Sequence, residues 1–125
     1  MIEQTRFGTR KTVHRGFDDV LASTKRALAD HALHVVSEVD LGAEHRKCTV
    51  IGAWNALSAP AVEREPDLGA LLPCSVVVYE QGSGGACVVS AADPCNALEV
   101  AGPGLLVEQA VLDSAEKLQR VIESV

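Results

Sequence analysis

Four cysteines are the side chains of this sequence best suited to nucleophilic, redox or metal chemistry: Cys48, Cys74, Cys87 and Cys95. Cys74 directly follows a proline and opens an apolar run, 74-CSVVVYE-80. A thiol that lines a pocket and a thiol that packs in a core both fit this position, because free cysteine is among the most frequently buried residue types. The pattern therefore leaves both interpretations of Cys74 open.

Thiol chemistry at Cys74 would be nucleophilic, redox or sulfur-carrying. It requires a thiol pKa that is lowered by a helix N-terminus or a nearby cation, together with partial exposure. No neighbour in the sequence supplies such a group, so Arg64 or a histidine would have to lie nearby in space. No complete catalytic constellation accompanies the thiol, and the sequence therefore favours a binding protein over an enzyme.

Signatures of metals and cofactors are weak. His45 and Cys48 form an H-x-x-C pair, and His31 and His34 have the same spacing, but both pairs lack the further ligands of a zinc or copper site. The glycine-rich 82-GSGG-85 is not followed by the helix that a phosphate loop needs, and a hairpin turn is expected there. We expect neither a metal nor a cofactor.

Composition and charge fit one soluble domain over residues 1–125. Apolar residues make up 47% of the 125 positions, which is enough for a sizeable core. The 11 basic and 17 acidic residues give a net charge of −6, which opposes binding to nucleic-acid phosphates. No apolar run approaches the ~20 residues of a membrane span, and no signal peptide is recognisable. We expect a cytoplasmic protein without nucleic-acid or membrane partners.

The elements that position these side chains follow from periodicity, and their order is strand, helix, strand, strand, helix, strand, strand, helix. Strands are expected at 9–15, 32–40, 48–54, 74–80 and 86–91, and helices at 17–31, 55–65 and 105–125. The 55–65 helix requires Ser58 as its cap. These elements predict an α+β fold, with helices packed on a largely antiparallel sheet.

The strand at 32–40 shows how one face of this sheet is expected to meet water. Alternation places Leu33, Val35 and Val39 on one side. His34 and Glu38 fall on the other side, which suits a strand with one wet face. A sheet with an uncovered face or edge would favour a symmetric dimer.

A pocket is expected near the start of the 74–80 strand, between the sheet and the last helix. Its candidate lining residues are Trp54, Asn55, Cys74 and Asp93, which combine apolar walls with a few polar groups. Two alternatives stay open: Trp54 as a core or interface anchor, and Asp93 as the organiser of its turn through backbone amides. The sequence favours a module that binds a small molecule or a partner. The alternative is a thiol-based redox or sulfur-handling protein that uses Cys74.

Several segments resemble a bacterial and archaeal family, domain of unknown function 302. They are 15-RGFDDVLASTKRAL-28, 50-VIGAWN-55, 66-PDLGALLPCSVVVYE-80 and 89-VSAADP-94. The proline-cysteine strand and the Ser-Ala-x-Asp-Pro motif are the most specific of these marks, and the resemblance spans roughly residues 10–125. It implies a small α+β protein that associates as a homodimer, and it implies no assigned activity.

One position departs from the pattern of the family that the chain resembles. Relatives usually carry a cysteine in a Gly-Ala-Cys-Asn context, whereas this chain reads 52-GAWN-55. Trp54 therefore stands where the resemblance implies a second thiol. A mechanism that needs both thiols is not expected in this chain.

Overall fold

The computed structural model describes residues 2–42, 46–82, 85–102 and 104–125. Its strands are β1 (Ile2–Gln4), β2 (Gly8–Val13), β3 (Leu33–Asp40), β4 (Cys48–Asn55), β5 (Cys74–Gln81) and β6 (Ala86–Ala92). Its helices are α1 (Phe17–Asp30), α2 (Ala59–Arg64), α3 (Asn96–Ala101) and α4 (Leu105–Ser124), with 3-10 turns η1 (Ala56–Ser58) and η2 (Pro66–Ala70).

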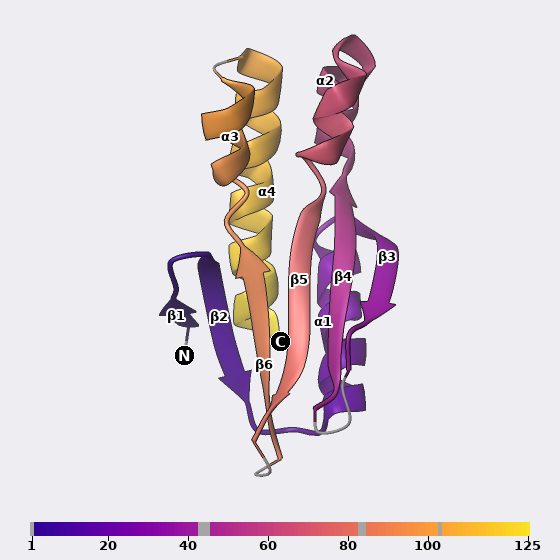
Figure 1. Cartoon of the computed structure of the whole chain (residues 1–125), viewed down its shortest axis with the longest axis vertical. Coiled ribbons are helices and arrows are strands. Elements are labelled where there is room, and N and C mark those ends of the chain that lie inside the picture. The colour runs from indigo at the N-terminus through magenta and orange to yellow at the C-terminus, as the bar shows by residue number, and fades with distance from the viewer. Residues whose placement is uncertain (1, 43–45, 83–84, 103) are drawn as a thin grey trace.

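The strands form one six-stranded antiparallel sheet in the order β1-β2-β6-β5-β4-β3. Figure 1 shows α1 and α4 on the far side of this sheet, while α2 and α3 stand beyond its upper end beside the first turns of α4. The α+β class predicted from periodicity is confirmed. Among the described helices, only α1 and α4 lie against a face of the sheet, so the near face is left uncovered by them.

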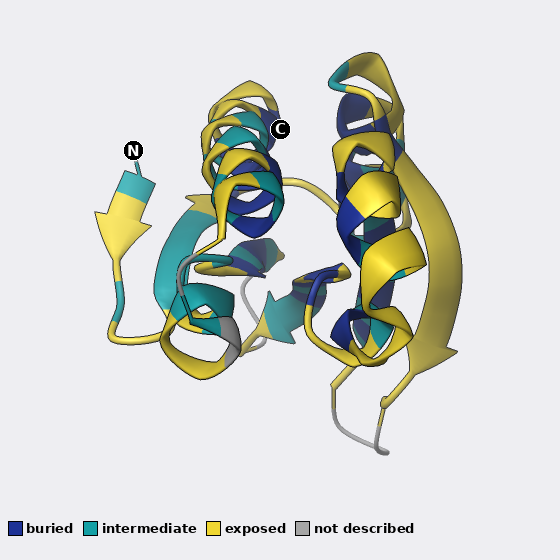
Figure 2. Cartoon of the chain, turned by 90° about the horizontal axis from the view of Figure 1, so that it is seen from above, coloured by how far each residue is buried: buried dark blue, intermediate teal, exposed yellow. Residues whose placement is uncertain are grey.

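The main core lies between the sheet and these two long helices. In β4, Thr49, Ile51 and Ala53 are buried on the helix side, while the alternate residues are half-buried on the other side. Leu28 of α1 and Ile122 of α4 are fully buried in the same core. Seen from above in Figure 2, α4 turns buried segments inward and exposed segments outward, as an amphipathic helix does.

A second apolar cluster lies at the end of the molecule that carries α2 and α3. Its buried members are Ala61, Leu68, Leu72, Val107 and Val111. Figure 1 shows that α4 extends past the ends of the strands here, so its first turns pack on α2, η2 and α3. This end is therefore built mainly from helices.

The expected side-chain alternation of β3 is wrong beyond its fourth residue. The pairing with β4 shifts between Val35 and Ser37, which marks a β-bulge. A bulge adds one residue to a strand, and every later side chain changes face. Glu38 consequently lies on the helix side, where its carboxylate is 3.2 Å from Lys25 Nζ of α1, and Val39 lies on the uncovered face.

Other elements differ from their expected bounds. The sequence does not predict β1 or α3, and the expected 55–65 helix is divided into η1 and α2. Ser58 occupies the N-cap position of α2, as predicted, but its side chain makes no capping hydrogen bond. The Asn55 side chain caps η1 by accepting from the Leu57 amide at 3.1 Å. β5 and β6 pair as the predicted hairpin, but its turn residues 83–84 lie outside the described residues, as does His45.

Candidate functional site

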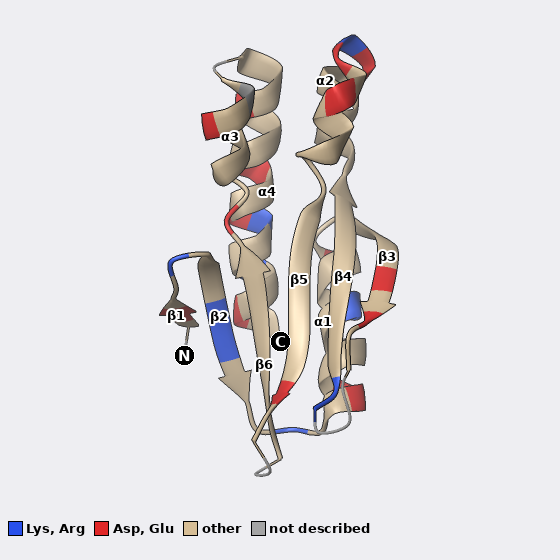
Figure 3. Cartoon of the chain, viewed as in Figure 1, with Lys and Arg blue, Asp and Glu red and all other residues tan. Residues whose placement is uncertain are grey.

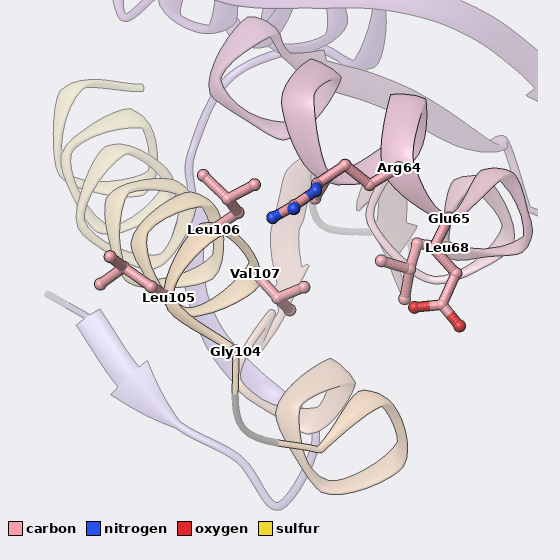
Figure 4. Close-up of a pocket in the computed structure, with 8 residues that line it drawn as sticks. Arg64, Glu65, Leu68, Gly104, Leu105, Leu106 and Val107 are labelled. Atoms are coloured by element: carbon pink, nitrogen blue, oxygen red, sulfur yellow. The ribbon is translucent and has the colours of Figure 1, made fainter.

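A cavity of about 360 Å³ opens between α2, η2 and the first turn of α4. Most of its lining is apolar: Ala61, Leu68, Leu105, Leu106 and Val107. Figure 4 shows these segments facing one another across the opening, with Arg64 and Glu65 completing the lining from the end of α2. The volume lies within the range that small-molecule sites show in other proteins, and such sites also have mostly apolar walls.

Local sequence explains how the two walls arise. α2 stops after Arg64 because Pro66 follows, and the residue before a proline avoids the helical conformation. α4 begins at Leu105, and its first turns lie beyond the end of the sheet. With no strand beneath it, Leu105 stays 70% exposed.

Arg64 is the cation of this site. Figure 4 shows its guanidinium directed toward Leu106, while the Glu65 carboxylate lies on the other side of Leu68 in this view. No carboxylate of the described residues lies within ion-pair distance of Arg64. Arg64 is the basic residue of the last turn of α2, and Figure 3 shows a blue segment at the tip of this helix. The cavity thus combines apolar walls with one available positive charge.

A second hollow, of about 300 Å³, lies beside the start of β5 and under α3. Cys74 and Asp93 both line it, together with apolar side chains that include Leu71 and Val100. Two of the four predicted site residues therefore come together. Cys74 contributes little surface, since it is 4% exposed, and it faces the main core with Val76.

The environment of the Cys74 thiol does not favour the thiolate. Burial raises the pKa of Cys74 above the ordinary 9.0, although a hydrogen bond with Ser114 and the charge of Lys117 act in the opposite direction. The sequence suggests Arg64 or a histidine as the cation near this thiol, but the structure places Lys117 of α4 there.

Asn55 holds a polar network beneath α4 and is 1% exposed. Its Nδ2 donates to Asp113 Oδ2 at 2.8 Å and to Ser114 Oγ at 2.9 Å. Lys117 Nζ lies 2.8 Å from the same Asp113 oxygen. Asn55 thus reaches Cys74 only through Ser114, and its own polar atoms are already bonded within the protein.

Trp54 and Asp93 fit the alternative roles named above, an apolar anchor for Trp54 and a turn organiser for Asp93. Trp54 is half-buried and packs against the second apolar cluster, whose members Leu68 and Val107 line the 360 Å³ cavity. Asp93 Oδ1 accepts the Cys95 amide at 2.9 Å, which confirms that this carboxylate organises its own turn.

Sequence reasoning missed the cavity that Arg64 lines. A signal was present in Leu105 and Leu106, because adjacent positions of one helix diverge by about 100° and cannot both face the same core.

The described residues contain no group of three or more His, Cys, Asp or Glu side chains that could share a metal ion. No helix in the described ranges is long and apolar enough to cross a membrane.

Comparisons with known proteins address the fold and the family. The family model described as "Domain of unknown function DUF302" matches residues 9–125. Among solved structures, the uncharacterized conserved protein DUF302 from Bacillus stearothermophilus superposes with a TM-score of 0.74; identity is 17%, over 96% of this chain and 98% of that chain. No curated protein matches the chain. The structural likeness, at this identity, concerns the fold.

Proposed function

We propose that this chain, which belongs to the DUF302 family, is a binding module for a small, mainly apolar molecule. The observation that carries the proposal is the cavity of about 360 Å³ between α2 and α4, whose walls are largely aliphatic. Binding sites for small molecules are typically concave and apolar, with a few polar groups that orient the ligand. The cavity has this composition.

Exposed leucines around this end of the molecule support the same role. Leu105, which lines the cavity, is 70% exposed, and Leu57 of η1, which packs on α2 and α4, is 53% exposed. Isolated exposed apolar residues are common, but a group of them beside a cavity is typical of a binding surface. A ligand in the cavity would remove part of this surface from water.

The experiment is a fluorescence titration with Nile red, an uncharged apolar dye. We expect saturable binding of one dye per chain. Leu106→Trp should fill the cavity from the α4 side and weaken binding by about tenfold, which corresponds to about 1.4 kcal/mol. Leu112→Trp is the matched control, because Leu112 is 58% exposed on the same helix and does not line the cavity. Equal dye affinity of both variants would refute the location.

Thiol chemistry at Cys74 is the alternative function, for which the adjoining 300 Å³ hollow is the supporting observation. Two properties weigh against it. The thiol is 4% exposed, and burial raises its pKa, whereas a reactive thiol needs access and a lowered pKa. The binding function therefore has the stronger support.

We also propose that two chains associate as a homodimer through the uncovered face of the sheet. Val39, Val50 and Val77 stand side by side on three neighbouring strands of that face, and we call them the valine row. Val39 is 51% exposed in the single chain. A symmetric pairing would bring the two valine rows together and bury them.

A further inference from the structure

We infer that the ligand of the α2–α4 cavity carries one carboxylate group on an apolar body, and that Arg64 binds this carboxylate. The inference rests on the proposed function, and it adds the chemical class of the ligand. It follows from the charge of Arg64, from the walls that face it and from the acidic residues around it.

The charge of Arg64 is available to a ligand. The structure pairs several other cations with carboxylates of the protein, as at Arg10 with Glu3, Lys25 with Glu38 and Lys117 with Asp113. Arg64 has no such partner among the described residues, although Glu65 is its neighbour. A guanidinium presents its donors in a planar fork that fits the two oxygens of a carboxylate.

The walls opposite Arg64 suit an apolar body. Figure 4 shows Leu106 and Val107 on the α4 side, facing the guanidinium across the opening. Leu68 and Ala61 line the same cavity and are buried members of the second apolar cluster. A ligand that lay along these side chains would bury apolar surface and keep its charged end near Arg64 at the rim.

The charges around the site favour a single negative charge on the ligand. Glu63 and Glu65 flank Arg64 in the sequence, and the whole chain carries a net charge of −6. One guanidinium can balance one carboxylate, whereas a doubly charged phosphate would add repulsion that this site does not compensate. The recognised class is therefore an amphipathic monocarboxylate.

The test compares three compounds that share a ten-carbon chain and differ in charge: decanoate, decanol and decylammonium. Each displaces Nile red from the wild-type protein at pH 7, and the expected order of affinity is decanoate, then decanol, then decylammonium. In Arg64→Gln, decanoate should bind about fivefold more weakly, while decanol should bind as before. Arg64→Lys should retain more of the preference for decanoate than Arg64→Gln does.

Two further variants separate a local contact from general electrostatics. Arg26→Gln removes the same charge from an exposed position on α1 and should leave every affinity unchanged. Leu106→Glu keeps Arg64 and places a tethered carboxylate on the wall that faces it, so it should selectively weaken decanoate. Circular dichroism of each variant verifies that its fold is intact.

The outcomes distinguish this inference from the proposed function. If the dye and all three compounds fail to bind, both the function and the inference fall. If decanol and decanoate bind equally and Arg64→Gln changes neither, the cavity binds ligands but the inference is overturned. Preference for decanoate that disappears in Arg64→Gln and persists in Arg26→Gln supports it.

Discussion

At the scale of single residues, burial determines the chemistry of Cys74. We expect iodoacetamide to modify Cys74 at least about tenfold more slowly in the folded protein than in urea, because the thiol is 4% exposed and burial raises its pKa above 9.0. Peptide mass spectrometry after alkylation at several pH values measures this rate, with half-buried Cys48 as the internal comparison. Faster alkylation of Cys74 near pH 7 in the folded protein would instead support the thiol function.

Asn55 provides a second prediction at this scale. Asn55→Ala should lower the free energy of unfolding by about 2–3 kcal/mol, because it removes the cap of η1 and leaves Ser114 and Asp113 without a buried donor. Urea denaturation measures the loss. Ser23→Ala, at a half-buried position of α1, is the comparison and should cost less. A cost below that of the comparison would contradict the role of Asn55.

The acid dependence of stability tests the same network through Asp113. Burial tends to raise the pKa of Asp113, but hydrogen bonds with Lys117 and Asn55 hold it below 3.8. Because the folded pKa lies below the unfolded one, this stabilisation is present above about pH 4 and is lost as the pH falls through the folded pKa. In Asn55→Ala the acid-induced loss of unfolding free energy should be smaller. Parallel pH profiles of the two proteins would exclude the coupling.

At the scale of elements, the close approach of β2 to the end of β6 depends on Gly8. A Cβ atom at Gly8 would lie 2.0 Å from the backbone oxygen of Ala91 and 2.8 Å from the amide of Asp93. Gly8→Ala should therefore destabilise the protein by about 1–3 kcal/mol in urea denaturation. At Gly69 a new Cβ would meet only a methyl group of Val62, at an ordinary 3.8 Å, so Gly69→Ala is the matched control. Equal stability of both variants would contradict the proposed packing.

The elements were largely predictable from the sequence, and the reason is that their signals are local. Periodicity predicted β4, β5 and α4 to within one residue at each end. The bulge in β3 was not predictable, because it is set by pairing with β4. At the bulge, Ser37 of β3 lies so close to Gly52 of β4 that a Cβ atom at Gly52 would be 2.2 Å from Ser37 Oγ.

The candidate site was less predictable than the fold. Cys74 and Asp93 do line one hollow, but Arg64 and Leu106 belong to segments far apart in the sequence, and their meeting depends on how far α2 and α4 extend past the sheet. No local pattern encodes that distance. Two adjacent leucines at the start of α4 were the only sequence signal of an apolar surface.

At the scale of the whole molecule, the valine row predicts the oligomeric state. Light scattering should give twice the 13.2 kDa mass of one chain. Val77→Lys places a charge at the β5 end of the row and should yield a folded monomer, because an unpaired charge opposes burial of this face. Leu112→Lys, at a 58% exposed position of α4 on the other side of the sheet, should remain a dimer. A monomeric wild-type protein would contradict the proposed association.

The most direct test of ligand binding in the α2–α4 cavity is amide chemical-shift mapping by NMR during a titration with decanol, which carries no charge and so does not depend on the role of Arg64. We predict saturable shifts centred on Ala61, Leu68, Leu106 and Val107, with little change at Val77 on the sheet. Shifts confined to the sheet, or no saturable shifts at all, would contradict the assignment of this cavity as the binding site.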